Sequence, residues 1–192
     1  MAQKDKIKWD NKYKELPKLL EKRDPCEKLV KFIDKVSKEK ALDVACGSGR
    51  NSIYMANNGF QVDALDISSV ALENLNKLNN KNINTLLVDL DEYNFQENTY
   101  NLIIKTNFLD RDIIQKLKKS LKKNGIIVIE TYMEDEENEK KHSNPDYLLK
   151  KDELKSFFTD GFEILDYDEF FNETYELYRM KKQSIVVKKL SL

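Results

Sequence analysis

Two of the five glycines in the chain, Gly47 and Gly49, stand two positions apart in the segment 42–51, which reads LDVACGSGRN. The segment follows a short apolar run and precedes a helical pattern. Glycine allows the backbone to approach a ligand closely, and the N-terminus of a helix presents unpaired N–H groups to it. Because glycine pairs also form ordinary turns, the motif by itself predicts only a candidate ligand-binding turn.

Three carboxylates sharpen this interpretation, because Asp43, Asp66 and Asp89 fall in the C-terminal half or at the end of three successive predicted strands. Asp66 can accept hydrogen bonds from both ribose hydroxyls of a nucleoside, and Asp89 can accept one from an adenine amino group. An aspartate on an apolar strand is costly unless its carboxylate is satisfied. The alternative is that each aspartate caps the following helix, but together the three favour a nucleoside-containing ligand.

The elements that must position these residues alternate between short apolar strands and amphipathic helices. The pattern predicts strands at 41–45, 60–65, 83–88, 101–104 and 126–129. It predicts a helix at 8–22 that kinks or restarts at Pro17, a helix from Pro25, and helices at 49–58, 68–78 and 151–159. A further helix is expected to start at Asp110, continue through Leu121 and stop at Asn124-Gly125, and the expected N-caps are Asp24, Ser68 or Ser69, Asp110 and Asp152. Such alternation is typical of an α/β fold with a parallel sheet and helices on both faces. Ligands of these sheets bind beyond the carboxyl ends of the strands, where the strand order reverses.

We interpret residues 1–192 as a single domain without internal repeats. An N-terminal helical cap covers residues 1–38, and the βα units that carry the site cover 39–133. The acidic run within 134–146 predicts a mobile, solvated loop, with a lid as the alternative. Residues 147–192 are expected to form a helix and a C-terminal antiparallel strand pair.

Composition excludes several classes of protein. The 33 basic and 34 acidic residues leave a net charge of −1, which argues against a dedicated nucleic-acid-binding protein. No apolar run approaches the ~18–20 residues that span a membrane, and the N-terminus lacks the apolar segment of a secretory signal. Cys26 and Cys46 are expected to be free thiols in a reducing compartment. We therefore expect a cytoplasmic protein without membrane or nucleic-acid partners, either a monomer or a weak homodimer.

The glycine turn and the strand that follows it resemble a known family. The run Asp43-x-Ala45-Cys46-Gly47-Ser48-Gly49-Arg50-Asn51-Ser52, followed by Asn58-Gly59-x-x-Val62-Asp63-x-x-Asp66, is similar to the nucleotide-binding half of class I S-adenosylmethionine-dependent methyltransferases. The segments 125–132 and 147–154 resemble the tellurite-resistance-type and generic small-molecule branch. The resemblance implies a Rossmann-like, doubly wound, mostly parallel seven-stranded sheet of order 3-2-1-4-5-7-6, whose last strand is antiparallel.

The same resemblance implies a function. S-adenosylmethionine would donate a methyl group to a small-molecule acceptor by in-line displacement, leaving S-adenosylhomocysteine. Position by position, it assigns Asp43 to the methionine amino group, Asp66 to the ribose and Ile67 to packing on adenine. The other implied cofactor contacts are the close backbone at Ala45, Cys46, Gly47 and Gly49, the adenine edge at Asp89 and Leu90, and the methyl-donor end at Lys105, Thr106 and Asn107.

Residues outside this set are open to two interpretations. Trp9 and Tyr13 either close over the site from the N-terminal helix or simply pack against their neighbours. No metal-ligand set and no evident catalytic base emerge; His142 and Tyr132 are the candidates for a base. Arg111 and Lys105 are candidates to hold an anionic acceptor, or they are surface residues.

Two departures from the family pattern bear on the site. Ala45 stands where the first glycine of the family is usual, which is compatible with a negative φ. The connection between the last two strands reads Asn172-Glu173-Thr174-Tyr175-Glu176, where tellurite-resistance-type proteins carry basic and histidine residues, and this argues against tellurite as the acceptor.

Two alternative functions remain at the level of sequence. A nicotinamide-dependent NAD(P)-binding oxidoreductase would also use the glycine pair and Asp66, although Ser52 occupies the third glycine position and the chain leaves little room for a catalytic domain. A non-catalytic protein that binds a nucleoside cofactor would bind the same ligand and transfer no methyl group.

Overall fold

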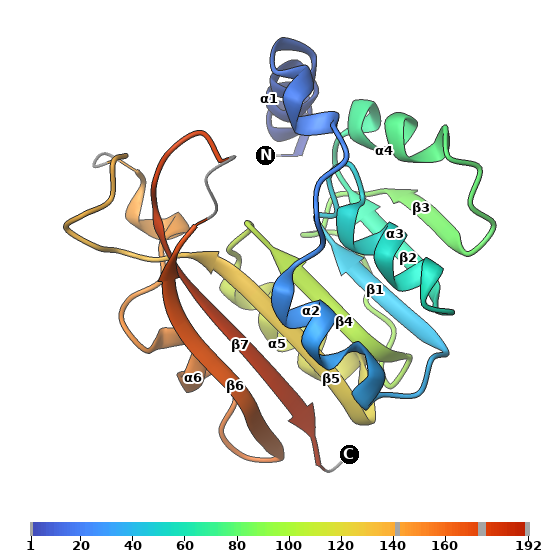
Figure 1. Cartoon of the computed structure of the whole chain (residues 1–192), viewed down its shortest axis with the longest axis vertical. Coiled ribbons are helices and arrows are strands. Elements are labelled where there is room, and N and C mark those ends of the chain that lie inside the picture. The colour runs from blue at the N-terminus through green and yellow to red at the C-terminus, as the bar shows by residue number, and fades with distance from the viewer. Residues whose placement is uncertain (1, 141–142, 173–175, 191–192) are drawn as a thin grey trace.

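The computed structural model describes residues 2–140, 143–172 and 176–190, with the backbone alone at Ala2. Within these residues one seven-stranded sheet has the order β3-β2-β1-β4-β5-β7-β6 (Figure 1). The strands are β1 (Lys40–Val44), β2 (Gln61–Asp66), β3 (Ile83–Leu87), β4 (Tyr100–Thr106), β5 (Leu121–Tyr132), β6 (Phe162–Phe171) and β7 (Lys181–Lys189). Neighbours among β1 to β5 are parallel, and β7 is antiparallel to both β5 and β6. The predicted fold class and strand order are confirmed.

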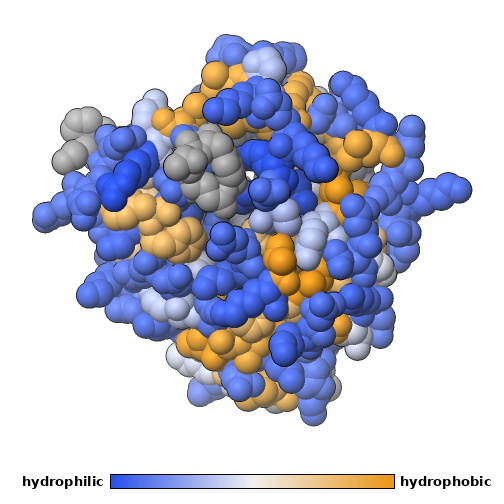
Figure 2. Space-filling view, in the orientation of Figure 1, coloured by the Kyte–Doolittle hydropathy of each residue, from blue (hydrophilic) through white to orange (hydrophobic). Residues whose placement is uncertain are grey.

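Helices cover both faces of this sheet, with α2 in front of it and α5 behind it in Figure 1. The α-helices are α1 (Ala2–Glu15), α2 (Glu27–Phe32), α3 (Arg50–Asn57), α4 (Ser69–Asn76), α5 (Arg111–Ser120) and α6 (Glu153–Ser156), and the 3₁₀ turns are η1 (Pro17–Leu20), η2 (Ile33–Lys35) and η3 (Pro145–Tyr147). None of the described helices is both long enough and apolar enough to cross a membrane. The face in Figure 2 is mostly hydrophilic, and its apolar patches are scattered.

Strand alternation divides the buried side chains into two cores. Leu42 and Val44 of β1 pack with Ile113 and Leu117 of α5 on one face. On the other face, a second core joins the sheet to α2 and α3, and it contains Cys26, Leu29, Ala41, Met55, Leu102, Ile104 and Val128. Asp43 lies between Leu42 and Val44 in β1, so alternation directs its side chain to the α3 face.

Two of the expected helix caps are present. The Ser68 side chain accepts a hydrogen bond from Ala71 N at the start of α4, and Asp110 accepts one from Ile113 N at the start of α5. Asp24 was the wrong residue for α2, whose N-cap is Cys26. The Cys26 N–H donates to Asn51 Oδ1 over 2.9 Å, which fastens this residue to α3 and leaves the helix to begin after it.

The boundaries near β5 also differ from the prediction. The helix that was expected to continue through Leu121 ends at Ser120, and β5 begins at Leu121, which pairs with Tyr100 before a register shift. Asn124 takes a φ of +64° inside this longer strand. Asp152 precedes α6 at a φ of +59° and makes no capping bond, because its carboxylate binds Lys155 instead.

The acidic segment 134–146 contacts the connection between β6 and β7. Asn138 is buried; its Nδ2 donates to Met133 O, and its Oδ1 accepts from Lys181 N over 2.7 Å. Asp135 pairs with Lys181, also at 2.7 Å. His142, the candidate base from the sequence, lies outside the described residues.

Candidate functional site

The carboxyl ends of β1, β2 and β4 lie side by side at the point where the strand order of the sheet reverses. β2 and β3 lie on one side of β1, and β4 lies on the other. This arrangement creates the crevice in which ligands of open α/β sheets bind. The loop between β1 and α3 carries Gly47 and Gly49 into this crevice, as the sequence predicted.

Asp66 at the end of β2 organises the glycine loop. Its Oδ2 accepts a hydrogen bond from Gly47 N over 2.7 Å, and its Oδ1 accepts one from Ser68 N over 2.8 Å. Burial raises the pKa of Asp66, and these backbone N–H groups act in the opposite direction. Each oxygen of an ionised carboxylate has two acceptor positions. Asp66 therefore holds the loop and keeps acceptor capacity for a ligand hydroxyl.

The glycines adopt backbone conformations that favour glycine. Gly47 has a φ of +55°, and a Cβ at this position would lie 2.7 Å from the hydroxyl oxygen of Tyr13. Gly49 has a φ of +80°, and its Cβ would lie 2.6 Å from the Leu75 side chain of α4. The first glycine thus permits a close approach from α1, and the second permits close packing of α3 on α4.

Ala45 departs from the sequence-based expectation of a negative φ, since its φ is +54°. The adjacent Cys46 N–H donates to Leu65 O over 2.9 Å, and the Cys46 carbonyl accepts from Gly49 N over 3.0 Å. These bonds hold the turn in the left-handed region although alanine occupies it. The left-handed conformation costs an L-residue about 1–2 kcal/mol.

Replacing Ala45 by glycine is expected to stabilise the protein. Relief of the left-handed strain exceeds the added entropy of the unfolded chain, so the free energy of unfolding should rise by about 0.5–1 kcal/mol. Thermal unfolding measures this change. Ala64→Gly, in β2 and at no positive φ, is the control and should lower the melting temperature. A lower melting temperature for Ala45→Gly would contradict the strained turn.

Asp43 is buried beneath the loop on the α3 face. Its Oδ2 accepts a hydrogen bond from Ser52 Oγ over 2.6 Å. Burial raises the pKa of Asp43 to about 7, while the Ser52 hydroxyl and the Arg50 charge oppose that shift. A carboxylate with this pKa responds strongly to any cation that a ligand brings beside it.

The segment after β3 starts at the carboxyl end of that strand, next to Asp66. Val88 N donates to Asp66 O, which continues the strand pairing toward Asp89. Asp89 is half-buried and its Oδ1 accepts from Asp91 N, while Leu90 is buried. A cavity of about 500 Å³ opens here, lined by Val88, Asp89, Glu92, Tyr93, Asn94 and Gln96. Ile67, half-buried, follows Asp66 directly.

The three residues that end β4 separate between the two faces of the sheet. Lys105 is buried on the face of α5, where its Nζ donates to the carbonyl of Phe108, and burial lowers its pKa to about 7. Thr106 lies on the other face and accepts a hydrogen bond from Asn51. Asn107 has a φ of +58°, and its buried Oδ1 has no hydrogen-bond partner among the described residues.

Helix α1 lies over the glycine loop and the start of α4. Asp10 accepts hydrogen bonds from Ser68 Oγ over 2.7 Å and from Lys6 over 2.6 Å. These bonds hold the pKa of Asp10 at about 2, against the effect of burial. Tyr13 is buried over Gly47, and its ring centroid lies 6.0 Å from that of Trp9. The structure therefore brings Tyr13 into the site, with Trp9 behind it.

Arg111 and Tyr132 have partners that the sequence did not indicate. Arg111 binds both carboxylate oxygens of Glu153, at 2.6 and 3.2 Å, and the carbonyls of Asp146 and Leu148. Tyr132 donates to Glu176. Arg111 thus fastens α6 to α5, and Tyr132 belongs to a buried polar cluster that sequence reasoning missed. Glu130 at the end of β5 was the available signal for that cluster, since a carboxylate interrupts an apolar strand there.

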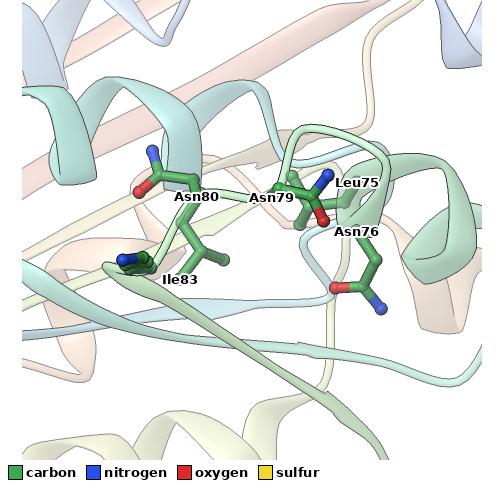
Figure 3. Close-up of a pocket in the computed structure, with 6 residues that line it drawn as sticks. Leu75, Asn76, Asn79, Asn80 and Ile83 are labelled. Carbon is green, nitrogen blue, oxygen red and sulfur yellow. The ribbon is translucent and has the colours of Figure 1, made fainter.

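A second cavity is remote from these residues. It has a volume of about 460 Å³ and is lined by Leu75, Asn76, Asn79, Asn80, Lys81 and Ile83. Figure 3 shows the asparagines on the turn that leads from α4 into β3. This turn lies at the amino end of β3, whereas the glycine loop lies at the carboxyl ends of the strands. We therefore exclude this cavity from the site.

The sheet order and the strand-end glycine loop define the class I methyltransferase fold. The chain belongs to the TehB family, because the family profile described as "Tellurite resistance protein TehB" matches residues 6–189. A curated relative from Haemophilus influenzae, "Probable S-adenosyl-L-methionine-dependent methyltransferase TehB", is 31% identical over 153 residues, which are 73% of this chain and 52% of the relative. The chain thus spans about half the length of the curated relatives it matches.

Solved structures agree with this assignment. The crystal structure of TehB from Haemophilus influenzae superimposes with a TM-score of 0.72 and 27% identity, over 85% of this chain and 60% of that one. A SAM-dependent methyltransferase from Methanosarcina mazei gives a TM-score of 0.70 with 17% identity, over 84% of this chain and 97% of that one. The second likeness supports the fold alone.

Proposed function

We propose that this chain binds S-adenosylmethionine and transfers its methyl group to a small-molecule acceptor. The observation that carries the proposal is the pairing of the Gly47 loop with the Asp66 carboxylate at the point where the strand order reverses. A glycine loop supplies close backbone, and a strand-end acid accepts from ribose hydroxyls. The Haemophilus influenzae relatives, each named a probable S-adenosyl-L-methionine-dependent methyltransferase, support the same cofactor.

The residues present fit this cofactor. Gly47 lets the loop backbone lie close beneath Tyr13, where a Cβ would not fit, and Asp66 keeps acceptor capacity beyond its backbone bonds. The orphaned Oδ1 of Asn107 offers a further acceptor at the end of β4. A buried polar atom without a partner is rare in proteins, and a bound ligand is one of its explanations.

In this proposal, different residues of the chain contact different parts of the cofactor. Asp66 would hold the ribose, with Ile67 against the adenine, and the backbone at 45–49 would approach the methionine portion near Asp43. Asp89 and Leu90 would face the adenine edge, since they line or adjoin the cavity after β3. Thr106 and Asn107 would lie beside the reacting end. Lys105 points to the opposite face and would support Phe108 rather than touch the ligand.

The chain's contribution to the reaction is chiefly alignment. When bound, S-adenosylmethionine supplies a sulfonium methyl group that is already activated for displacement. Holding two reactants in line lowers the barrier without a strong base. Tyr13 and α1 would close the crevice above the glycine loop, which excludes water from the reacting groups.

Affinity for S-adenosylhomocysteine is expected to depend on pH through Asp43. Its pKa of about 7 in the free protein means that protonated Asp43 stabilises the fold at acid pH, and this contribution is lost as pH rises toward 7. The ligand's ammonium group favours the ionised Asp43 carboxylate, so binding should release a proton. The affinity should therefore increase by up to about tenfold per pH unit between about pH 6 and pH 7, and it should change little at higher pH.

Calorimetry in buffers of different ionisation enthalpy would detect the released proton. Asp43→Asn should remove the pH dependence and retain the fold, because the amide can still accept from Ser52. Affinity that stays constant between pH 6 and pH 8 in the wild type would contradict the role of Asp43.

Domain organisation, compartment and oligomeric state complete the proposal. We propose a single methyltransferase domain that acts in the cytoplasm on a small molecule, as a monomer or weak homodimer, and without a nucleic-acid partner. The near-balance of charge supports the absence of a nucleic-acid partner. Residues 134–146 would border the acceptor side of this domain, next to β7.

Incubation with methyl-labelled S-adenosylmethionine and cell extract tests the function. Label is expected in one or a few small molecules, and Asp66→Asn, which should not bind the cofactor well, serves as the matched control. A wild-type protein that binds the cofactor but labels nothing beyond the Asp66→Asn background would support a non-catalytic binding protein instead.

A further inference from the structure

A chain of buried polar side chains runs through the interior at the carboxyl end of β5. Glu130 Oε1 accepts from Lys182 Nζ over 3.3 Å, and its Oε2 accepts from Cys26 Sγ, also over 3.3 Å. Lys182 also binds Glu176, which accepts in turn from Tyr132. The side chains of Glu130, Glu176 and Lys182 are 6%, 7% and 1% exposed. We call these five residues the Glu130 cluster.

The Glu130 cluster adjoins the proposed cofactor site. The carbonyl of Glu130 accepts from Asn107 N over 2.8 Å. Cys26 N binds Asn51 Oδ1, and Asn51 Nδ2 binds Thr106. The cluster thus touches, through two separate connections, the residues at the end of β4 that lie beside the reacting end.

Stability does not account for this cluster. Moving charges from water into the interior costs several kcal/mol per ion, and apolar residues of similar volume often replace a buried ion pair at no loss of stability. The Glu130 cluster draws its members from four separate parts of the chain: the loop before α2, the end of β5, the residues after β6, and β7. Convergence of ionisable groups with specific charge partners is frequent at functional sites.

One side chain beside the cluster still lacks a partner. Ser184 pairs with Glu130 across β5 and β7, and alternation places it on the same face as Lys182. Ser184 is fully buried, and its Oγ has no hydrogen-bond partner within the described part of the chain. This buried hydroxyl next to a carboxylate leaves a hydrogen-bonding position that a further polar group can satisfy.

The charges of the cluster restrict what that group can be. Within the cluster, two carboxylates against one ammonium give a formal charge of −1, since burial raises the pKa values of the Cys26 thiol and the Tyr132 phenol and keeps both neutral. The Arg50 charge acts on Tyr132 from outside the cluster, so Glu130 itself is the group that opposes a negative charge at its Oε2. The only donor to Glu130 Oε2 among the described residues is the Cys26 thiol, which is a weak one. An incoming N–H or S–H group can displace it, whereas an oxyanion would face repulsion.

We infer that the Glu130 cluster is the acceptor subsite and selects acceptors that present an N–H or S–H hydrogen to Glu130, against oxyanions. The inference rests on the proposed methyl transfer. As the acceptor's lone pair forms its bond to the methyl carbon, the methyl–sulfur bond breaks with its electron pair retained by sulfur, and the acceptor's proton passes to the Glu130 carboxylate. Glu130 Oε2 is the acceptor-facing atom, while Lys182 and Glu176 fix its charge and position.

Rates of methyl transfer to three probes test the inference: a simple thiol, a simple primary amine, and tellurite. The wild type should methylate the thiol or the amine at least about tenfold faster than tellurite. Glu130→Gln should lower kcat/KM for the thiol or amine by about 100-fold or more, because the amide cannot take the proton. Its affinity for S-adenosylhomocysteine should stay within about twofold of the wild type, since no cofactor charge is removed.

Two further variants distinguish an effect on the choice of acceptor from a general effect on folding. Glu176→Gln changes the formal charge of the cluster from −1 to zero while the Glu130 carboxylate itself remains, and should raise the tellurite-to-thiol rate ratio about tenfold. Asp166→Asn removes a carboxylate of β6 that binds Lys28 and Lys31 outside the cluster, and should leave both rates and the ratio unchanged.

The outcomes are distinct. A Glu130→Gln protein with wild-type rates, a wild type that prefers tellurite, or a cofactor-binding wild type that methylates none of the probes would each overturn the acceptor subsite. If Glu130→Gln does not fold, an unchanged tellurite-to-thiol rate ratio in Glu176→Gln would overturn the acceptor subsite instead. A wild type that fails to bind S-adenosylhomocysteine contradicts the proposed function itself.

Discussion

Replacing Asp66 by asparagine is expected to weaken the binding of S-adenosylhomocysteine about 100-fold while the protein stays folded. The carboxylate now accepts from Gly47 N and Ser68 N and, in our proposal, from the ribose hydroxyls. An amide must turn an NH₂ group toward one of these backbone donors, so it loses an anchor of the loop as well as the charge. Calorimetric titration measures the affinity.

Asp63→Asn is the matched control for this experiment. Asp63 lies in the same strand on the opposite face, where it binds Lys40, Asn84 and Tyr100. Its replacement should lower stability modestly and leave the affinity unchanged. If Asp66→Asn binds the ligand as well as Asp63→Asn does, the assignment of Asp66 to the ribose is wrong.

Gly47→Val is expected to abolish measurable cofactor binding and leave the fold largely intact. The substitution puts a β-branched residue at a φ of +55° and a Cβ 2.7 Å from the Tyr13 hydroxyl. The strain costs about 1–2 kcal/mol, which a domain with two apolar cores tolerates. The valine side chain also pushes Tyr13 away from the glycine loop and forces the loop backbone to move, so affinity should fall beyond detection by calorimetry.

Gly59→Ala separates backbone strain from steric exclusion. Gly59 has a φ of +95° at the end of α3, and nothing lies within 4 Å of the position of its Cβ. This variant should lose stability to a similar extent and bind the cofactor normally. Normal affinity in Gly47→Val would count directly against the position of the site.

The fold was predictable because its signals are local. The alternation of apolar strands with amphipathic helices indicated a parallel sheet, and the caps at Ser68 and Asp110 were identified from residue type alone. The meeting of Gly47 and Asp66 was equally accessible, since both stand at strand ends whose geometry is common to doubly wound sheets; their roles toward a cofactor stay a prediction. Their direct hydrogen bond follows from that geometry.

The rest depends on contacts between distant segments. Ala45 takes a positive φ because bonds from Leu65 and Gly49 hold the neighbouring Cys46, and residue type alone favours the opposite sign. The N-cap of α2 lies at Cys26 because Asn51, 25 positions along the chain, binds its N–H. Tertiary bonds of this kind override local preference.

The Glu130 cluster could not be predicted for the same reason. Cys26 and Glu130 are 104 positions apart, and Lys182 joins them from β7. For Lys105 the sequence position was misleading, because the residue stands at a strand end beside Thr106 and yet its side chain faces α5. Strand alternation alone decides which of two neighbouring residues reaches the crevice.

Thermal unfolding in the presence of competing cofactors tests the central claim most directly. S-adenosylhomocysteine at 100 times its dissociation constant should raise the free energy of unfolding by about 2.7 kcal/mol. For a domain of this size, that gain raises the melting temperature by roughly 5–10 °C. NAD⁺ and NADH at the same concentration should leave it unchanged. Stabilisation by NAD⁺ or NADH without stabilisation by S-adenosylhomocysteine would contradict the assignment and support an oxidoreductase.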